Sequence, residues 1–260
     1  MGAFLIRISI FILLFSLSCF SFSLLLFAEE GSQKEEVKEV KEERPKTLCQ
    51  GKLSNLLSPF CTEARSVFLY GSLLTTGIYL SRADTSNRVR INTIKEKPLK
   101  DTANVGNIIG LGFLNASYFT YQALWGNVHN AELMAEASAY TAAVTWILKH
   151  LVNERRPGNS NDTKSFPSGH TSMAFAFSSV VGARHGLGWG SLAYLTAVFI
   201  AYTRIHDDYH YLHDVVFGAT LGMSYGLGIH YNHKQGHPYW VMPVPTADGK
   251  GMQLVMKIPF

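Results

Sequence analysis

The sequence predicts an all-α fold, a bundle of six helices, and two observations predict it. Between about residues 53 and 235, apolar residues recur with helical spacing, and no convincing run of alternating apolar and polar residues interrupts them. Gly, Asn and Pro residues divide this stretch into pieces of helical length. The expected helices cover residues 63–82, 104–125, 131–153, 168–185, 189–204 and 209–232.

The N-terminal segment, residues 1–28, predicts export. Residues 8–28 hold 16 apolar residues in 21, and Arg7 is the only charged residue before Glu29. This pattern is typical of a cleaved signal peptide, but the stretch is also long enough for an uncleaved membrane anchor. Lipoprotein processing at Cys19 is a third, less favoured reading, because the apolar run continues past it. In each case we expect the remainder to be exported to the bacterial cell envelope, in the periplasm.

Beyond this segment the chain has three parts. Residues 29–48 alternate acids and bases with few large apolar side chains, as in a solvated spacer. The helical domain is expected at 49–236 and a C-terminal extension at 237–260, where two apolar stretches flank a polar turn and favour a β-hairpin. Cys49 and Cys61 are the only cysteines after the first segment, and an oxidising compartment favours a disulfide between them over two free thiols.

Composition excludes several classes of protein. Of the 260 residues, 47% are hydrophobic and 16% charged, which is not the composition of a disordered chain. The net charge of +4 is too small to indicate nucleic-acid binding, although it suits an anionic substrate. The uncharged runs at 165–183, 185–203 and 215–233 contain many Gly, Ser, Thr and His residues. This favours helices that face water over helices that cross a membrane, and both remain open.

Two clusters suggest an anion site. Lys149 and Arg156 lie seven residues apart, so both cations can point the same way if the helix expected at 131–153 continues as far as Arg156, before Pro157 forces the chain out of it. Further along, Ser168-Gly169 opens a helix whose free N–H groups suit an anion, with His170 on the same turn. Each cluster alone also fits an ordinary helix end.

The third cluster is Thr203-Arg204 followed by His210 and Asp214. On a helix, residues four apart meet, so the carboxylate of Asp214 can accept a hydrogen bond from one ring nitrogen of His210. The other nitrogen is then left as a nucleophile or base. Taken together, three cations, a helix N-terminus and two histidines are the parts needed to hold and transfer a phosphoryl group.

In this order and at these spacings, the three clusters resemble the motifs of the type 2 phosphatidic acid phosphatase superfamily. That superfamily also includes class A bacterial acid phosphatases and vanadium-dependent haloperoxidases. The resemblance spans about residues 66–232 and implies the six-helix bundle of the superfamily; Gly218 and Gly222 fit its last helix. Thr203 departs from the usual serine but keeps a hydroxyl, and residues 205–209 form a crowded insert whose acids could alter substrate preference or pH optimum.

The resemblance also implies a mechanism. His210 attacks phosphorus to give a phosphohistidine, Asp214 holds its ring, and His170 protonates the leaving oxygen and then activates water. The phosphate oxygens are held by Lys149, Arg156, Ser168, Gly169 and Arg204. No cofactor and no metal is expected, because the cations neutralise the phosphate. The implied substrate is a phosphomonoester or pyrophosphate. An envelope lipid at a membrane surface is the favoured carrier of this phosphate.

Three alternatives stay open at this point. The chain could be a soluble non-specific periplasmic acid phosphatase or a vanadium-dependent haloperoxidase, since the same residues suit all three activities. A metalloprotein is a more remote alternative, with His206, His210, His213 and Asp214 as ligands. The remaining histidines lack comparable partner spacing and are interpreted as bystanders: His129, His150, His185, His230, His233 and His237. The sequence indicates no oligomeric state.

Overall fold

The computed structural model describes residues 54–85, 106, 109–157, 161–234, 240–245 and 252–257. The chain divides into two compact units, Met1–Lys46 and Thr47–Phe260, and every described residue belongs to the second. The predicted signal or anchor, the charged spacer and Cys49 lie outside the described residues. Cys61 is disulfide-bonded, and the Cys49–Cys61 pairing stays a prediction.

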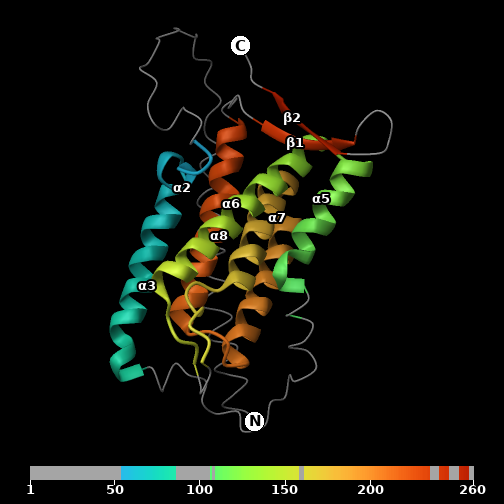
Figure 1. The fold of residues 1–260 in the computed structure, drawn as a ribbon. Coiled ribbons are helices and arrows are strands. Elements are labelled where there is room, and N and C mark those ends of the chain that lie inside the picture. The colour runs from blue at the N-terminus through green and yellow to red at the C-terminus, as the bar shows by residue number, and fades with distance from the viewer. Residues whose placement is uncertain are drawn as a thin grey trace, which may run out of the picture. The chain divides into compact units, whose positions relative to one another are not determined.

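The described part of the second unit is a helical bundle, which confirms the all-α prediction. A short helix α2 (Ser58–Cys61) precedes α3, and a π-helical turn η2 (Ile109–Phe113) precedes α5. In Figure 1, α6, α7 and α8 lie between α3 and α5, and α8 makes its closest packing with α7. The long helices are α3 (Arg65–Thr85), α5 (Leu114–Trp125), α6 (Val128–Val152), α7 (Gly169–His206) and α8 (Leu212–Lys234).

Helix α7 consists of the two predicted helices joined by a sharp turn. Gly186 has φ 78° and ψ −174°, a conformation that a residue with a side chain rarely adopts, and it divides α7 into two halves. The halves run antiparallel: Ser178 Oγ donates to the Ala193 carbonyl at 2.8 Å, and Ser179 Oγ lies 2.9 Å from the Tyr194 hydroxyl. The turn therefore brings the start and the end of α7 to the same end of the bundle.

The prediction of one continuous helix over 104–125 is wrong in its first part. Gly112 has φ 97°, so the chain kinks there, and the regular helix α5 begins only at Leu114. The spacing of apolar residues in the sequence does not predict this break, because the same spacing continues through η2.

Two glycines of α8 allow it to touch α7 closely. A Cβ atom at Gly218 would lie 2.7 Å from the Ser168 carbonyl oxygen, and one at Gly222 would collide with the Ser172 carbonyl oxygen. With glycine at both positions, the Ser168 amide can donate to the Asp214 carbonyl at 3.0 Å. This contact sets the first turn of α7 against the first turn of α8. The core behind it is formed by buried residues of α6, α7 and α8, among them Leu133, Met134, Val180, Leu221 and Ile229.

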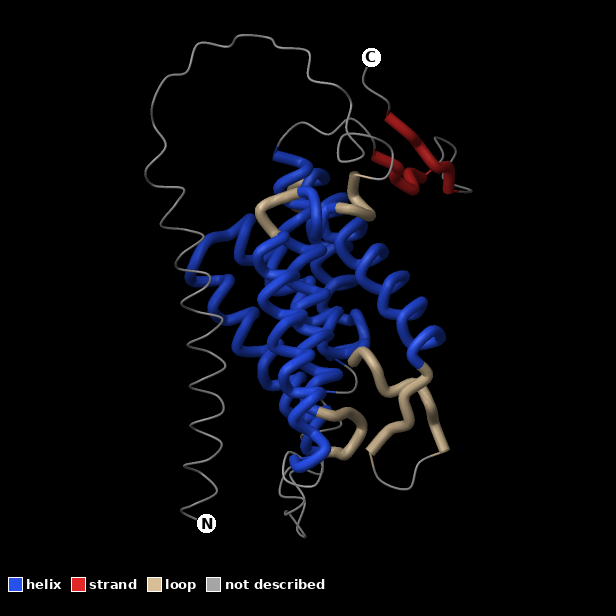
Figure 2. Tube along the Cα trace, turned by 90° about the vertical axis from the view of Figure 1, so that its left-hand side faces the viewer, coloured by secondary structure: helices blue, strands red, loops and turns tan. Residues whose placement is uncertain are grey.

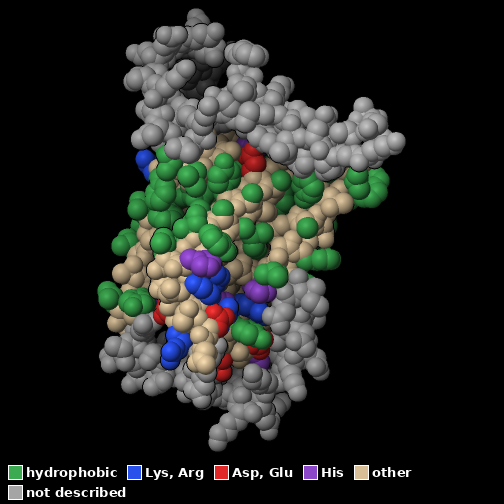
Figure 3. Space-filling view, in the orientation of Figure 1, with side chains coloured by type: hydrophobic (Ala, Val, Ile, Leu, Met, Phe, Trp, Pro, Cys, Tyr) green, Lys and Arg blue, Asp and Glu red, His purple; other side chains and the backbone are tan. Residues whose placement is uncertain are grey.

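Many large apolar side chains of the described helices are exposed. Leu73 and Leu80 on α3 are 68% and 71% exposed, and Trp125, Leu151 and Trp189 reach 75%, 75% and 65%. Figure 3 shows hydrophobic side chains spread over the helices, while charged side chains and histidines gather toward one end of this face. In the part of the chain that the structure describes, no helix combines the length and the apolar character that a membrane span requires.

Two strands follow the bundle. β1 (Trp240–Pro245) pairs with β2 (Met252–Lys257) in an antiparallel ladder, with Val241 opposite Met256 and Val244 opposite Gln253. Figure 2, turned from the view of Figure 1, shows these strands in red and the helices in blue. The same view shows the described loop residues between α6 and α7 at one end of the helices.

Candidate active site

The three sequence clusters meet at one end of the bundle, which we call the pocket end. Arg156 Nη1 lies 3.3 Å from His210 Nε2 and thus joins the first cluster to the third. The Ser168–Asp214 backbone contact joins the second to the third. The Arg204 carbonyl accepts from the His210 amide at 3.2 Å, which fixes the loop between α7 and α8. The geometry thus brings together segments that are up to 65 residues apart, from Lys149 to Asp214.

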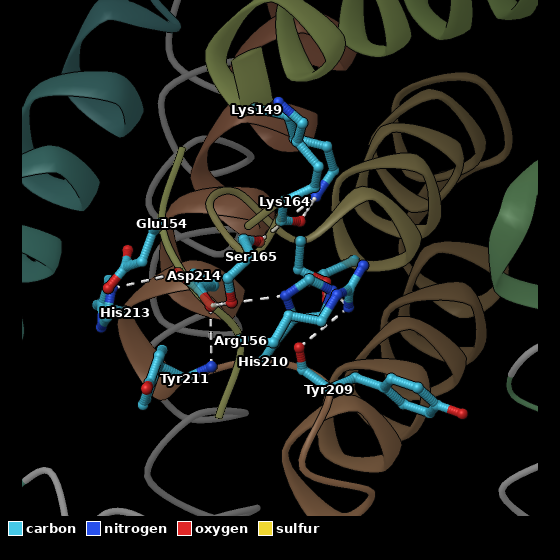
Figure 4. Close-up of polar contacts among 12 residues, drawn as sticks. Lys149, Glu154, Arg156, Lys164, Ser165, Tyr209, His210, Tyr211, His213 and Asp214 are labelled. Carbon is cyan, nitrogen blue, oxygen red and sulfur yellow. Dashed lines mark hydrogen bonds and ion pairs between the residues drawn. The ribbon is translucent and has the colours of Figure 1, made fainter. Parts of the chain in front are cut away.

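His210 is buried between a carboxylate and an arginine. Its Nδ1 lies 3.5 Å from Asp214 Oδ2, a long ion-pair contact, while its Nε2 faces the Arg156 guanidinium (Figure 4). Because a guanidinium can only donate, this contact favours the tautomer with an unprotonated Nε2. Burial, helped by the charges of Lys149 and Arg156 and opposed by Asp214, lowers the pKa of His210 below its ordinary value. The imidazole is therefore neutral at pH 7, with Nε2 as the lone-pair nitrogen.

Asp214 is fully buried at the start of α8 and has an extensive set of donors. Its Oδ2 accepts from the Ser165 hydroxyl at 2.6 Å and from the Tyr211 amide at 2.9 Å (Figure 4). Its Oδ1 lies 3.1 Å from His213 Nε2. Burial alone would raise the pKa of Asp214, but His210 and His213 hold it well below its usual range. The carboxylate therefore stays ionised and orients His210.

His213 is a second imidazole on the same carboxylate. Its Nε2 lies 3.0 Å from Glu154 Oε2 as well as beside Asp214. Burial opposes the charged form, but Asp214 and Glu154 together raise the pKa of His213 to about 9. The ring also lines a cavity of about 470 Å³ with Tyr79 and Phe166. At neutral pH, Asp214 thus lies between a neutral imidazole and an imidazolium.

Two of the three cations are only partly buried and are held by the loop between α6 and α7. Lys149 Nζ donates to the Lys164 carbonyl at 2.7 Å, and burial followed by the Arg156 charge lowers its pKa to about 8. Arg156 donates to Asp162 Oδ2 at 2.6 Å and to the Tyr209 carbonyl at 3.0 Å. Both side chains are thus held in place on the side of His210.

The third cation, Arg204, is almost completely buried at the end of α7. It donates to Thr203 Oγ1 at 2.9 Å, and its guanidinium lies 5.4 Å from the centre of the Tyr209 ring. Burial lowers the pKa of Arg204, although an arginine remains charged at any physiological pH. The Thr203 hydroxyl accepts this hydrogen bond from Arg204, as a serine hydroxyl at the same position could.

The first turn of α7 provides backbone donors and a histidine. Ser168 occupies the N-cap position, but its side chain makes no capping bond and instead accepts from Thr171 Oγ1 at 3.0 Å. A Cβ atom at Gly169 would meet only Lys149 and Thr145, each at an ordinary 3.8 Å, so the protein itself does not require glycine there. Close approach of a ligand to the backbone would require it. His170 lies on the same turn and is partly exposed.

The ligand set of the metalloprotein alternative is not assembled among the described residues. His206 Nδ1 lies 2.9 Å from Asp207 Oδ1, and His206 shares no compact group of ligand atoms with His210. His213 and Asp214 do share such a group, with Glu154 as the third member. In that group, however, the histidine already bridges the two carboxylates.

Sequence reasoning missed three contributors to this site. Ser165 holds Asp214, Glu154 holds His213, and the Tyr209 carbonyl and ring contact Arg156 and Arg204. The only sequence signal was proximity to the motifs, because Ser165 precedes the Pro167-Ser168 step and Tyr209 precedes His210. From the sequence, His213 is expected only as a candidate metal ligand.

Comparisons with known proteins relate part of the chain to one family. The sequence profile of the PAP2 superfamily matches residues 130–237. Over 112 residues the chain is 32% identical to YbjG of Escherichia coli (strain K12), whose provisional name is undecaprenyl-diphosphatase; the match covers 38% of this chain and 57% of YbjG. The chain thus spans little more than half the length of that relative.

Two solved structures share the fold. LpxE of Aquifex aeolicus superposes with a TM-score of 0.50 at 24% identity, covering 56% of this chain and 93% of LpxE. A transmembrane PAP2-type phosphatidylglycerolphosphate phosphatase from Bacillus subtilis superposes with a TM-score of 0.52 at 19% identity, covering 66% of this chain and 96% of the other. The chain is therefore similar to the PAP2 superfamily over the segment that holds all three clusters, and the two solved structures share its helical fold.

Proposed function

We propose that this chain is a metal-independent phosphatase that hydrolyses a phosphomonoester or pyrophosphate of an envelope lipid through a phosphohistidine at His210. The observation that carries the proposal is the contact of Arg156 with the lone-pair nitrogen of a neutral, buried His210 that Asp214 orients. An arginine beside a nucleophilic nitrogen holds a phosphate oxygen next to the atom that attacks phosphorus.

In the first step, the lone pair of His210 Nε2 forms a bond to phosphorus and the bond from phosphorus to the leaving oxygen breaks. His170, protonated, gives its proton to that oxygen, because an alkoxide is a poor leaving group. Lys149, Arg156, Arg204 and the backbone at Ser168-Gly169 hold the other phosphate oxygens as charge develops. The proton on His210 Nδ1 stays between His210 and Asp214, and the Asp214 carboxylate stabilises the positively charged ring.

In the second step, the neutral His170 removes a proton from water, and the water oxygen forms a bond to phosphorus. The bond between phosphorus and Nε2 breaks, its electron pair returns to His210, and phosphate leaves. Each residue ends in the protonation state in which it began. No step requires a metal, because three cations neutralise the phosphate charge.

The lipid part of the proposal is supported by two observations. The relatives that match the chain carry the names of an undecaprenyl-diphosphatase and a phosphatidylglycerolphosphate phosphatase. In addition, exposed apolar side chains such as Leu73, Leu80 and Trp189 give the described helices surfaces suited to a lipid environment. We infer that the chain works at a membrane surface of the bacterial envelope, after export.

The direct test is phosphate release by the purified full chain in detergent. The panel holds phosphatidate, phosphatidylglycerophosphate, a polyprenyl diphosphate, lipid A and a soluble aryl phosphate. We expect release from at least one lipid, block by vanadate, and no immediate loss with EDTA. Faster turnover of the soluble ester would favour the acid phosphatase alternative. Halide oxidation that depends on vanadate would favour the haloperoxidase alternative. Release that stops as soon as EDTA is added would contradict the metal-independent mechanism.

A further inference from the structure

At the end of the bundle opposite the pocket, α6 begins and α8 ends. There His129, Glu132 and His233 form what we call the far-end cluster: one ligand atom from each lies within 4.8 Å of the other two. The two imidazole rings have centroids 5.0 Å apart, and His129 Nδ1 lies 3.7 Å from Glu132 Oε2. His129 and Glu132 lie on α6 and His233 lies on α8, about 100 positions later in the sequence, so only the fold brings them together.

Glu132 is the unusual member of the far-end cluster. It is only 7% exposed, and its Oε1 has no hydrogen-bond partner among the described residues. Leaving a buried carboxylate oxygen without a donor or a cation is costly. His129, by contrast, keeps 46% of its side chain exposed, so the cluster is open to solvent on one side. A cation entering from that side would satisfy the oxygen.

The surroundings also favour a cation. Glu136 Oε2 lies 2.9 Å from His233 Nε2 and accepts from Asn55 Nδ2 at 2.8 Å, so a second carboxylate orients one of the imidazoles. The positive group nearby, Arg184, donates to Asn130 Oδ1 at 2.6 Å rather than to Glu132. Two carboxylates and two imidazoles thus meet at this end.

We propose that the far-end cluster binds a zinc ion, with His129, Glu132 and His233 as ligands and water in a fourth position. Two imidazoles and a carboxylate are a donor set that zinc accepts in tetrahedral geometry. The ion joins the first turns of α6 to the last turn of α8. It lies about 25 Å along α6 from Lys149, at a rise of 1.5 Å per residue. The ion would hold these two helix ends together, and the expectation that the chain holds no metal then applies to the pocket alone.

The test uses the full chain in detergent, freed of affinity-tag histidines and stripped of metal with EDTA. Zinc is then titrated, and the stoichiometry, the Kd and the midpoint of thermal unfolding are measured; cobalt absorption reports the coordination. We expect one zinc per chain and a midpoint that rises with zinc concentration. His129→Ala and the isosteric Glu132→Gln should each weaken binding by more than about tenfold, and Glu136→Gln by roughly tenfold.

The matched control is His185→Ala, an exposed histidine outside the far-end cluster that contacts Tyr118. It should bind zinc like the unchanged chain. Circular dichroism checks that each variant folds, and the exposed position of His129 makes His129→Ala the safest of them. The proposal is overturned if the unchanged chain binds no zinc, or if binding survives both His129→Ala and Glu132→Gln. Loss of binding in His213→Gln alone would instead assign the ion to the group formed by Glu154, His213 and Asp214.

Discussion

The two ends of the bundle use the same side chains in opposite electrostatic settings. At the pocket end, Arg156 contacts His210 of the histidine and carboxylate pair His210–Asp214, and the charge of Lys149 also acts on this histidine. At the far end, His129 and His233 lie beside Glu132 and Glu136. Imidazole is suited to both settings, since its nitrogen can attack phosphorus or bind a metal. We expect the charge of the neighbours to favour an anion at one end and a cation at the other.

The largest expected effect separates the histidines of the pocket from an exposed one elsewhere. His210→Ala removes the proposed nucleophile, and turnover should fall by on the order of 10⁴-fold or more. The measurement is single-turnover phosphate release together with acid-quench trapping of a labelled phosphohistidine. His185→Ala is the control and should retain turnover. Substantial activity of His210→Ala would show that His210 is not the nucleophile. The contrast between a catalytic end and a metal-binding end of the bundle would then fail.

A smaller loss should follow from removing one cation of the pocket. Arg156→Ala deletes the donor beside His210 Nε2, and kcat should fall by about 10²–10³-fold, as for other preorganised donors. The exposed neighbour Arg155 gives a matched control, because Arg155→Ala removes the same charge from the surface. Equal losses in the two variants, measured as kcat/KM on the same lipid, would indicate a general electrostatic effect rather than a held phosphate.

The pH dependence of Lys149 sharpens the role of charge at the pocket end. Its pKa is about 8, so the ammonium loses its proton as the pH rises through that value, and kcat/KM should fall. From a pKa of about 8, the charged fraction falls roughly tenfold between pH 7 and pH 9. Lys149→Arg keeps the charge over this range and should move the fall to higher pH. An unchanged basic limb in Lys149→Arg would show that another group sets it.

His213 tests how Asp214 divides its charge between two imidazoles. His213→Gln removes an imidazolium from Asp214, so the carboxylate stabilises protonated His210 more strongly and the pKa of His210 rises. The acidic limb of kcat/KM should therefore move to higher pH, with a loss of about tenfold near pH 6, in the range seen for residues that orient a reacting ligand. Glu154→Gln should give a smaller shift of the same sign. A lower kcat with an unmoved limb would indicate only a structural role for His213.

The smallest effect concerns the packing between the two ends. Gly222→Ala places a methyl group against the Ser172 carbonyl and should destabilise the fold by about 1–3 kcal/mol, as overpacking typically does. Gly188→Ala is the matched control, because nothing lies within 4 Å of a Cβ atom there. The midpoint of thermal unfolding measures both. A similar midpoint in the two variants would mean that α8 can shift without cost.

The sequence was sufficient for what depends on local spacing. Helical periodicity located most of the helices, and the gap between those expected at 168–185 and 189–204 coincides with the break at Gly186. The motif spacing pointed to Arg156 and His210, which the structure brings into contact. It could not reveal contacts made by loops, such as the Ser165 hydroxyl on Asp214, because they depend on how the chain between α6 and α7 folds back. The far-end cluster was missed for the same reason: 104 positions separate His129 from His233.

The antiparallel halves of α7 have a consequence for how this domain can change in length. Gly169 and Arg204 stand at the open ends of a helical hairpin whose closed end is Gly186. An insertion of one helical turn in one half of α7 would shift Gly169 or Arg204 along the helix axis relative to the other. The distance between these two proposed phosphate-binding residues would then increase. Only an equal insertion in both arms would keep them aligned, so viable length variants of this hairpin should come in matched pairs.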